Sequence, residues 1–419
     1  MRLGCSEVEI TPQVPINLGG YGQRQKPAQG IASSLFARGF ILEEKELRLG
    51  LITADLLILN REQADLVKKR AGELTGINPA NIVMACSHTH SGPSPEPLLG
   101  NPPDPVYIDW LLQALAGTLF LAEKNLEEVT SGFASCPLEG IGANRRLAEE
   151  PVDSELIVLG FATGEGKLKA LLYNYACHPT VLGPDNLLVS PDYPGEAAAV
   201  VKKVFPGTIP GFLNGACGDI STRFTRRSQS HAEARRLGTI LGTGVVGLAA
   251  TLEFAPARLA ASLLFLPLQT KVPVAPAQAE AEIGRWQTQL AQLSKTGASA
   301  GELRQAQTGL EGALLQKELE GVIRTLGKEV QISLWQIGDL GLAAIPGELF
   351  SALGRMIKDE SPYEKTMVAG YSNGYIGYIP HREAYRQGGY ETLSSPLAPG
   401  FGETLAKETA AALHDLRKE

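Results

Sequence analysis

The sequence of 419 residues lacks the features that mark several protein classes. Its five cysteines are scattered and form no C-x-x-C pair, which indicates free thiols in a reducing compartment rather than a disulfide framework. Basic side chains are outnumbered, 38 against 45 acidic ones, and the net charge of -7 argues against binding to nucleic acid. The N-terminus has no apolar core of a secretory signal, so we expect a cytoplasmic protein.

The sequence predicts no membrane span either. The uncharged run Leu237–Leu252 is shorter than the ~20 residues that a span needs, and four glycines interrupt it. We interpret this run as a buried helix whose glycines allow close packing. Hydrophobic residues make up 44% of the chain, which is enough for a large buried core.

The first 270 residues alternate between strand-like and helix-like segments, and this alternation predicts an α/β fold of layered mixed β-sheets flanked by helices. Strands are expected at Glu7–Thr11, Phe36–Leu42, Leu47–Ala54, Ile82–Ser87, Leu156–Ala162, Leu168–Ala176 and Ile209–Asn214. Helices are expected at Arg61–Leu74, Tyr107–Asn125, Tyr193–Val204 and His231–Leu252.

The composition then shifts, although we expect residues 1–419 to form a single domain. Gln278–Lys328 is rich in Ala, Gln, Leu and Glu, with leucines at helical spacing, and predicts an inserted helical hairpin. Such a hairpin is suited to be a lid over a site or a contact in a homo-oligomer. Strands are expected at Gln331–Ile337, Leu342–Ile345 and Met367–Tyr371, a long loop at Ser372–Ser395, and a last helix at Gly402–Arg417.

Three of the six histidines follow apolar strands directly. His88 and His90 belong to the segment Ser-His-Thr-His-Ser-Gly-Pro, and His178 to Tyr-Ala-Cys-His-Pro. In an extended His-x-His, both rings point to the same side, and side chains converge on ligands at the carboxyl ends of strands. Because histidine is a common zinc ligand, these segments indicate a metal site, and a catalytic zinc takes further protein ligands.

Other polar residues also follow strands and have two interpretations each. Glu348 is either a further ligand or an acidic residue in the first turn of a helix. Asp219 and Ser221 lie among small residues that allow close approach to a ligand, or else form an ordinary turn. A group of arginines near these segments suggests a polar or anionic substrate: Arg145, Arg146, Arg223, Arg226 and Arg227.

The sequence resembles the catalytic domain of the neutral/alkaline non-lysosomal ceramidase superfamily. The motifs that carry the resemblance are Glu-Ile-Thr-Pro with Gly-Gly-Tyr-Gly, Ser-His-Thr-His-Ser-Gly-Pro, Tyr-Ala-Cys-His-Pro-Thr, Ser-Pro-Asp-Tyr-Pro-Gly, Gly-Asp-Ile-Ser, Pro-Gly-Glu and Ser-Asn-Gly-Tyr-Ile-Gly-Tyr-Ile. They occur in the family's order and span almost the whole chain. The resemblance implies a zinc-dependent hydrolase of amide bonds.

The resemblance also implies roles for individual residues. The zinc ligands would be His88, His178 and Glu348 with a tyrosine, either Tyr375 or Tyr378, of which we favour Tyr378. By the same resemblance, His90 and Arg145 would line the site and orient the substrate, and Ser221 matches a serine proposed as a nucleophile. The residue types themselves further suggest His90, Arg145, Tyr375 and Ser221 as catalytic residues, and Arg146, Asp219 and Arg223 as contacts of the substrate.

Three hypotheses of function follow. The first is a Zn²⁺ enzyme in which activated water cleaves an N-acyl bond of a small polar or amphiphilic substrate. The second is a serine hydrolase with Ser221 as the nucleophile, which requires a nearby base. The third is a non-catalytic binding protein that a metal stabilises.

Overall fold

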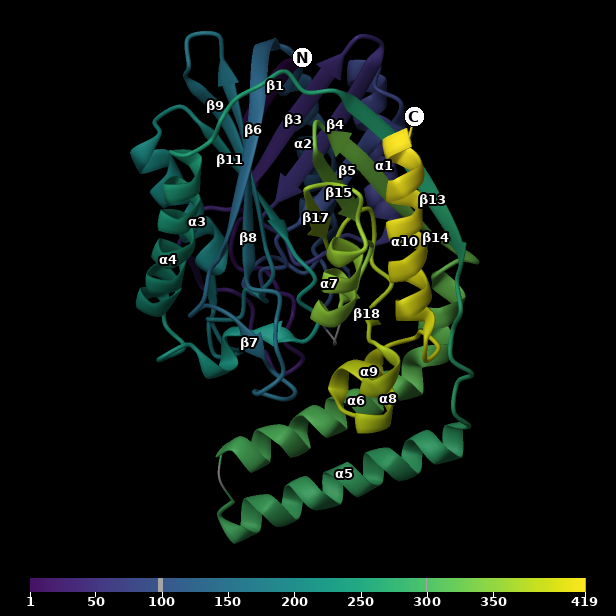
Figure 1. Cartoon of the computed structure of the whole chain (residues 1–419). Coiled ribbons are helices and arrows are strands. Elements are labelled where there is room, and N and C mark those ends of the chain that lie inside the picture. Colours follow the sequence, from purple (N-terminus) through teal and green to yellow (C-terminus); the bar gives the residue numbers. More distant parts are fainter. Residues whose placement is uncertain (97–100, 299, 419) are drawn as a thin grey trace.

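The computed structural model describes residues 1–96, 101–298 and 300–418, and they form four layers in which two face-to-face β-sheets are covered on their outer sides by helices (Figure 1). The larger sheet is ordered β11 (Ile209–Asn214), β9 (Leu168–Tyr175), β8 (Glu155–Thr163), β6 (Glu127–Pro137), β1 (Arg2–Glu9), β3 (Phe36–Glu44), β4 (Leu47–Ala54) and β5 (Ile82–Cys86). Its two end pairs, β11 with β9 and β4 with β5, are parallel. The predicted α/β class with layered mixed sheets is confirmed.

The smaller sheet is ordered β13 (Leu259–Pro267), β14 (Glu329–Ile337), β15 (Leu340–Ala344) and β17 (Lys365–Ala369). Its inner face packs on the larger sheet through fully buried side chains, among them Phe40 and Leu51 from one sheet and Trp335 and Leu342 from the other. Strands buried on both faces read as nearly continuous apolar runs, which is why several of them were predictable from sequence.

Helices cover the two outer faces. The larger sheet carries α1 (Arg61–Thr75), α2 (Pro105–Glu123), α3 (Asp192–Val204) and α4 (His231–Ala249), and the smaller one carries α7 (Ser351–Asp359) and α10 (Phe401–Lys418). A Cβ atom on Gly238 would lie 2.6 Å from the carbonyl oxygen of Tyr193, so this glycine allows α4 to pack closely on α3 as predicted. Of the described helices, α2 alone is apolar and long enough to cross a bilayer, and it packs on β1 and β3.

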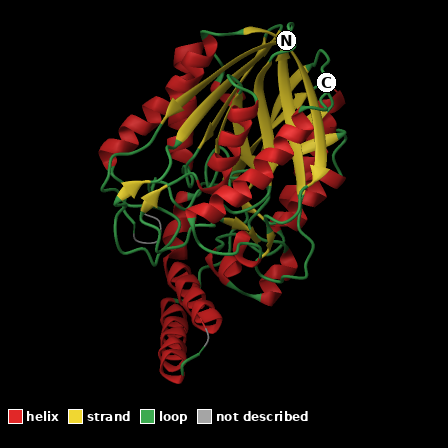
Figure 2. Ribbon diagram, turned by 90° about the vertical axis from the view of Figure 1, so that its left-hand side faces the viewer, coloured by secondary structure: helices red, strands yellow, loops and turns green. Residues whose placement is uncertain are grey.

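The inserted helical hairpin is formed by α5 (Pro276–Thr296) and α6 (Ala300–Thr325), and it projects from the layered body (Figures 1 and 2). The predicted range 278–328 includes residue 299, which lies outside the described residues. The two helices pack closely where Gly309 meets Trp286, and α6 contacts the body where Gly312 meets Leu393. The hairpin is therefore anchored beside the segment 390–394.

Some expectations from the sequence were wrong in detail. The expected loop Ser372–Ser395 contains β18 (Tyr378–Ile379), α8 (Arg382–Gln387) and α9 (Tyr390–Ser394). The first strand occupies Arg2–Glu9 because it pairs with β3 along its whole length, which no local pattern shows. The remaining short elements are β2 (Gly30–Ile31), η1 (Pro79–Asn81), β7 (Ala143–Asn144), β10 (Leu188–Val189), β12 (Ile220–Ser221), η2 (Thr222–Phe224) and β16 (Glu348–Leu349).

The larger sheet curls so strongly that its two edge strands, β5 and β11, approach each other. The segment after β17 closes the gap between them. The amide of Cys86 donates to the carbonyl of Tyr371 at 3.1 Å, and the amide of Gly370 donates to the carbonyl of Asn214 at 2.9 Å. The carboxyl ends of β5, β9, β11, β15 and β17 thus gather at one place.

Candidate active site

Polar side chains from both sheets meet at this gathering of strand ends. His88 follows β5, His178 follows β9, and Glu348 begins β16 after β15. The Oε2 atom of Glu348 lies 2.9 Å from Nε2 of His178 and 3.6 Å from Nε2 of His88. The Nε2 atom of His90 lies 3.2 Å from that of His88. The structure therefore brings together the three histidines and the carboxylate that the sequence singled out.

Backbone carbonyls fix the orientation of two of these rings. Nδ1 of His88 lies 2.9 Å from the carbonyl oxygen of Leu57, and Nδ1 of His178 lies 2.7 Å from that of Cys217. A carbonyl only accepts hydrogen bonds, so each Nδ1 carries the proton and each Nε2 has a free lone pair. Nε2 of His178 is buried and has no hydrogen-bond donor among the described residues, since its neighbour, Oε2 of Glu348, is itself an acceptor.

The route by which His88 and His90 reach the same place differs from the expected one. His88 is not extended but has a φ of +68°, a left-handed conformation that is uncommon outside glycine. The amide of His88 donates to the carbonyl of Leu56 at 2.8 Å, which helps hold this turn. The turn, rather than strand alternation, directs the His88 ring toward Glu348.

The three imidazoles are uncharged at neutral pH. Burial lowers the pKa of His88 to about 3, and it lowers the pKa values of His90 and His178 well below their usual range. The cause is desolvation, which disfavours the charged form of a buried imidazole. Neutral rings with exposed lone pairs are the form in which histidine binds metals.

Three tyrosines surround the carboxylate of Glu348. The Tyr375 hydroxyl donates to Oε1 at 2.6 Å, and the Tyr371 hydroxyl donates to Oε2 at 3.4 Å. The Tyr378 hydroxyl instead accepts a hydrogen bond from Nη2 of Arg145 at 2.9 Å. Burial raises the pKa values of all three phenols, so each keeps its proton at neutral pH. Tyr375 is thus the tyrosine of the two candidates that is bonded to Glu348.

Arg145 is held from several sides. Its Nε donates to Oε1 of Glu391 at 2.9 Å, and its Nη2 also donates to the carbonyl of Gly218 at 2.9 Å. Arg146 donates to Oε2 of Glu391 at 2.7 Å and to the carbonyl of Gly388 at 2.5 Å. Both guanidinium groups are therefore bound within the protein, which does not support the expectation that they recognise an anionic substrate.

The other predicted substrate contacts lie elsewhere. Asp219 accepts hydrogen bonds from the amide of Ser351 at 2.7 Å and from Asn144 at 3.1 Å, so it braces the start of α7. Arg223 is exposed on η2. Ser221 is buried and its hydroxyl accepts from the amide of Arg223 at 3.3 Å. Within the described residues, no imidazole is hydrogen-bonded to Ser221.

The sequence did not predict three residues that the structure places at the site: Tyr371, Glu391 and Gly20. Tyr371 stacks on the His88 ring at 3.9 Å between centroids, and its position at the end of an expected strand was the available signal. Glu391 joins the two arginines; the segment Gly-Tyr-Glu around it is one of the motifs that resemble the family, but its residue types do not indicate a buried charge. Gly20 lies against His90, and its φ of +92° is not visible in the sequence.

A cavity of about 430 Å³ opens above these groups. Glu348, Tyr375 and Tyr378 line it, together with His88 and His90. Leu315, Glu318 and Val322 of α6 also line it, so the inserted hairpin contributes to its boundary. A pocket of this size with converging polar groups is typical of sites for small molecules.

Comparisons with known proteins find similarity to neutral ceramidases in sequence and in fold. The profile of the family "Neutral/alkaline non-lysosomal ceramidase, N-terminal" matches residues 1–96. The neutral ceramidase of Pseudomonas aeruginosa is 22% identical over an alignment of 492 residues, covering 99% of this chain and 72% of that protein. Its crystal structure superimposes with a TM-score of 0.78 at 19% identity, covering 99% of this chain and 75% of that one. The chain is thus similar to the neutral/alkaline non-lysosomal ceramidases, in agreement with the resemblance that its motifs indicated.

The similarity to other neutral ceramidases is confined to part of their length. Those of Drosophila pseudoobscura and Drosophila melanogaster are each 27% identical, over 259 and 263 residues. Each match covers 52% of this chain and 36% of the Drosophila protein. The chain thus spans about a third of the length of these two ceramidases.

Proposed function

We propose that this protein is a metal-dependent hydrolase of amide bonds and that its metal is zinc. The observation that carries the proposal is the convergence of two oriented imidazoles on one carboxylate. His88 and His178 each turn an unprotonated Nε2 toward Oε2 of Glu348, at 3.6 and 2.9 Å. Nitrogen and carboxylate donors are the ligands that zinc takes in hydrolytic enzymes.

The donor set fits a divalent cation. A ligating histidine almost always donates its other ring N–H to a carbonyl or carboxylate, and His88 and His178 both do so. Nδ1 of His90 has no hydrogen-bond partner among the residues that the structure describes, so His90 lacks this support although its ring nitrogens lie in the same group. We therefore assign His88, His178 and Glu348 as ligands, with Tyr375 as the fourth, and leave His90 for proton transfer.

A zinc ion held by these residues would supply Lewis acidity and make water nucleophilic at neutral pH. His90 lies at the cavity, and its neutral imidazole is able to take a proton from water and return it to the leaving amine. The Tyr378 hydroxyl, which accepts a hydrogen bond from Arg145, also lines the cavity. Its own proton is available for the carbonyl oxygen of a bound amide, on which negative charge develops during attack.

Metal content and amide hydrolysis together test the proposal. Protein purified without chelator should contain about one zinc per chain by elemental analysis, and His178→Ala should lose most of it. His414→Ala is the matched control, because His414 is exposed and bonded to the carbonyl of Glu360. Chelation should abolish hydrolysis of N-acyl amino alcohols and added zinc should restore it. Full hydrolysis by metal-free protein would contradict the proposal.

The fourth ligand is tested separately. Tyr375→Phe should weaken zinc binding about tenfold or more, whereas Tyr378→Phe should keep zinc and lower kcat. The reverse result would return the ligand position to Tyr378.

A further inference from the structure

Arg24 is a buried cation next to the candidate site, and none of the proposed steps uses it. Only 4% of its surface is exposed. Burial lowers the pKa of its guanidinium to about 10, so the group remains charged at neutral pH. Among the described residues, no carboxylate forms an ion pair with Arg24, and its Nε has no hydrogen-bond partner. Because a buried charge without a counter-ion is costly, its presence suggests a role beyond packing.

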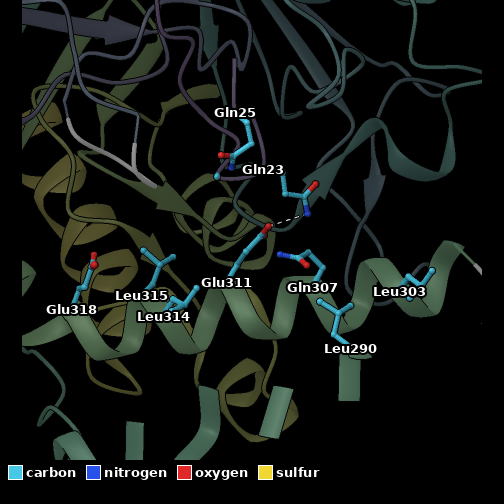
Figure 3. A pocket seen from close by; sticks show the side chains of 10 residues that line it. Gln23, Gln25, Leu290, Leu303, Gln307, Glu311, Leu314, Leu315 and Glu318 are labelled. Atoms are coloured by element: carbon cyan, nitrogen blue, oxygen red, sulfur yellow. Dashed lines mark hydrogen bonds between the residues drawn. The ribbon is translucent and has the colours of Figure 1, made fainter. Parts of the chain in front are cut away.

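The loop that carries Arg24 lies between the inserted hairpin and the body. Gln23 and Gln25 line a cavity of about 750 Å³ beside α6, and Nε2 of Gln23 donates to Glu311 of α6 at 3.0 Å (Figure 3). Arg24, between the two glutamines, is directed into the body instead. Its amide donates to the carbonyl of Tyr21 at 3.2 Å, which closes a turn in the loop.

This guanidinium joins three backbone segments. Nη1 donates to the carbonyl of Gly19 at 2.9 Å, and Nη2 donates to the carbonyls of His90 at 3.0 Å and Gly183 at 3.4 Å. The three segments are the loop itself, the turn that carries His88 and His90, and the stretch that follows His178. Since carbonyls only accept hydrogen bonds, a planar cation with several donors is suited to hold them together.

The same loop surrounds the imidazole of His90. Gly20 lies against Nδ1 of the ring, and the Tyr21 ring meets it edge to face, with 4.9 Å between centroids. The amide of His90 makes a long hydrogen bond of 3.4 Å to the carbonyl of Pro179. The shorter contact from Arg24 to the His90 carbonyl therefore contributes much of what fixes this residue.

We propose that Arg24 is a positioning residue that holds His90 where its imidazole transfers a proton in amide hydrolysis. The guanidinium fixes the His90 carbonyl directly, and through Gly19 it fixes the loop that packs on the ring. This inference rests on the proposed function, because the proton transfer assigned to His90 belongs to it. Loss of Arg24 should lower kcat and leave zinc bound, since other carbonyls orient His88 and His178.

The test is a double-mutant cycle on the N-acetyl derivative of a small amino alcohol. Arg24→Met keeps the aliphatic volume and should lower kcat about tenfold or more, with KM and zinc content near wild type. In a His90→Gln background it should change kcat by less than about twofold, because the ring that it positions is gone. Arg48→Met is the matched control and should leave kcat unchanged. Arg48 also donates to a backbone carbonyl, that of Thr75 at 2.6 Å, but lies at the strand end remote from the site.

Two further variants keep the test decisive if Arg24→Met folds poorly. Arg24→Lys keeps the charge and should recover part of the lost kcat. Millimolar guanidinium should raise the kcat of Arg24→Ala and should not raise that of Arg48→Ala. A loss of zinc from the Arg24 variants would place their effect on the metal ligands and overturn the proposal. A loss of kcat that adds in full to that of His90→Gln would overturn it as well.

A readout without activity separates this proposal from the proposed function. If wild-type protein cleaves no amide, the proposed function fails, and chemical modification decides whether Arg24 positions His90. Diethyl pyrocarbonate reacts with accessible neutral imidazoles, and mass spectrometry identifies the modified residue. His90 should react about fivefold faster or more in Arg24→Met than in Arg48→Met, with the exposed His414 as internal reference. Equal rates would overturn the positioning role.

Discussion

The substitution Gly20→Ala should disable His90 while it leaves the metal ligands in place. A Cβ atom at residue 20 would lie 2.4 Å from Nδ1 of His90, whereas ordinary contacts begin at 3.4 Å. The imidazole must therefore retreat by about 1 Å, a displacement that is able to cost about 100-fold in rate at a reacting group. The φ of +92° at Gly20 adds about 1–2 kcal/mol of strain for any L-residue.

Three measurements on this variant separate the roles of the histidines. We expect kcat for an N-acetyl amide to fall about 100-fold, zinc content by elemental analysis to stay near one per chain, and the free energy of unfolding in urea to fall by about 1–2 kcal/mol. Gly117→Ala is the control, since a Cβ there meets nothing within 4 Å and α2 should gain slightly in stability. Unchanged kcat would refute the role of His90 in proton transfer. Loss of zinc would instead place His90 among the ligands.

Two further predictions concern Ser221 and Glu391, which lie near the proposed metal site. Ser221→Ala should keep kcat within about threefold of wild type, because the hydroxyl caps η2 and is hydrogen-bonded to no imidazole in the described part of the chain. A loss of about 100-fold with zinc retained would restore Ser221 as the nucleophile. Glu391→Gln should lower the free energy of unfolding by about 3 kcal/mol, because it removes the buried charge between Arg145 and Arg146. It should also lower kcat, since Arg145 loses the partner that holds it beside Tyr378. An unchanged urea midpoint would contradict this reasoning.

The sequence predicted the layered fold and the convergence of the histidines because both follow from local patterns. Apolar runs marked β5, β9 and β11, and polar residues directly after them fall at strand ends, where they meet. Their actual proximity depends on the curl of the larger sheet, which brings its edges together. No local pattern encodes that curl, so the distances between His88, His178 and Glu348 were not predictable.

The role of Arg145 and Arg146 depends on a residue far away in the sequence. Arg145 and Arg146 lie in a short segment near the motifs, and an unpaired guanidinium there would suit an anion. Their common partner, Glu391, is about 245 residues away along the chain, within a segment that the sequence presented as a loop. The same applies to Tyr371, which looked like an ordinary strand residue and stacks on His88 in the folded protein. Long-range pairing decides which polar groups remain for the substrate.

The proposed ligands belong to two different layers of the molecule, and this division has a thermodynamic consequence. His88 and His178 follow strands of the larger sheet, whereas Glu348 and Tyr375 follow strands of the smaller one. A cation bound by both groups would link the two sheets. Metal binding would then stabilise the packing between the sheets, and a loss of that packing would weaken metal binding. A substitution of Trp335, which is buried between the sheets, should therefore weaken metal binding before it unfolds the protein.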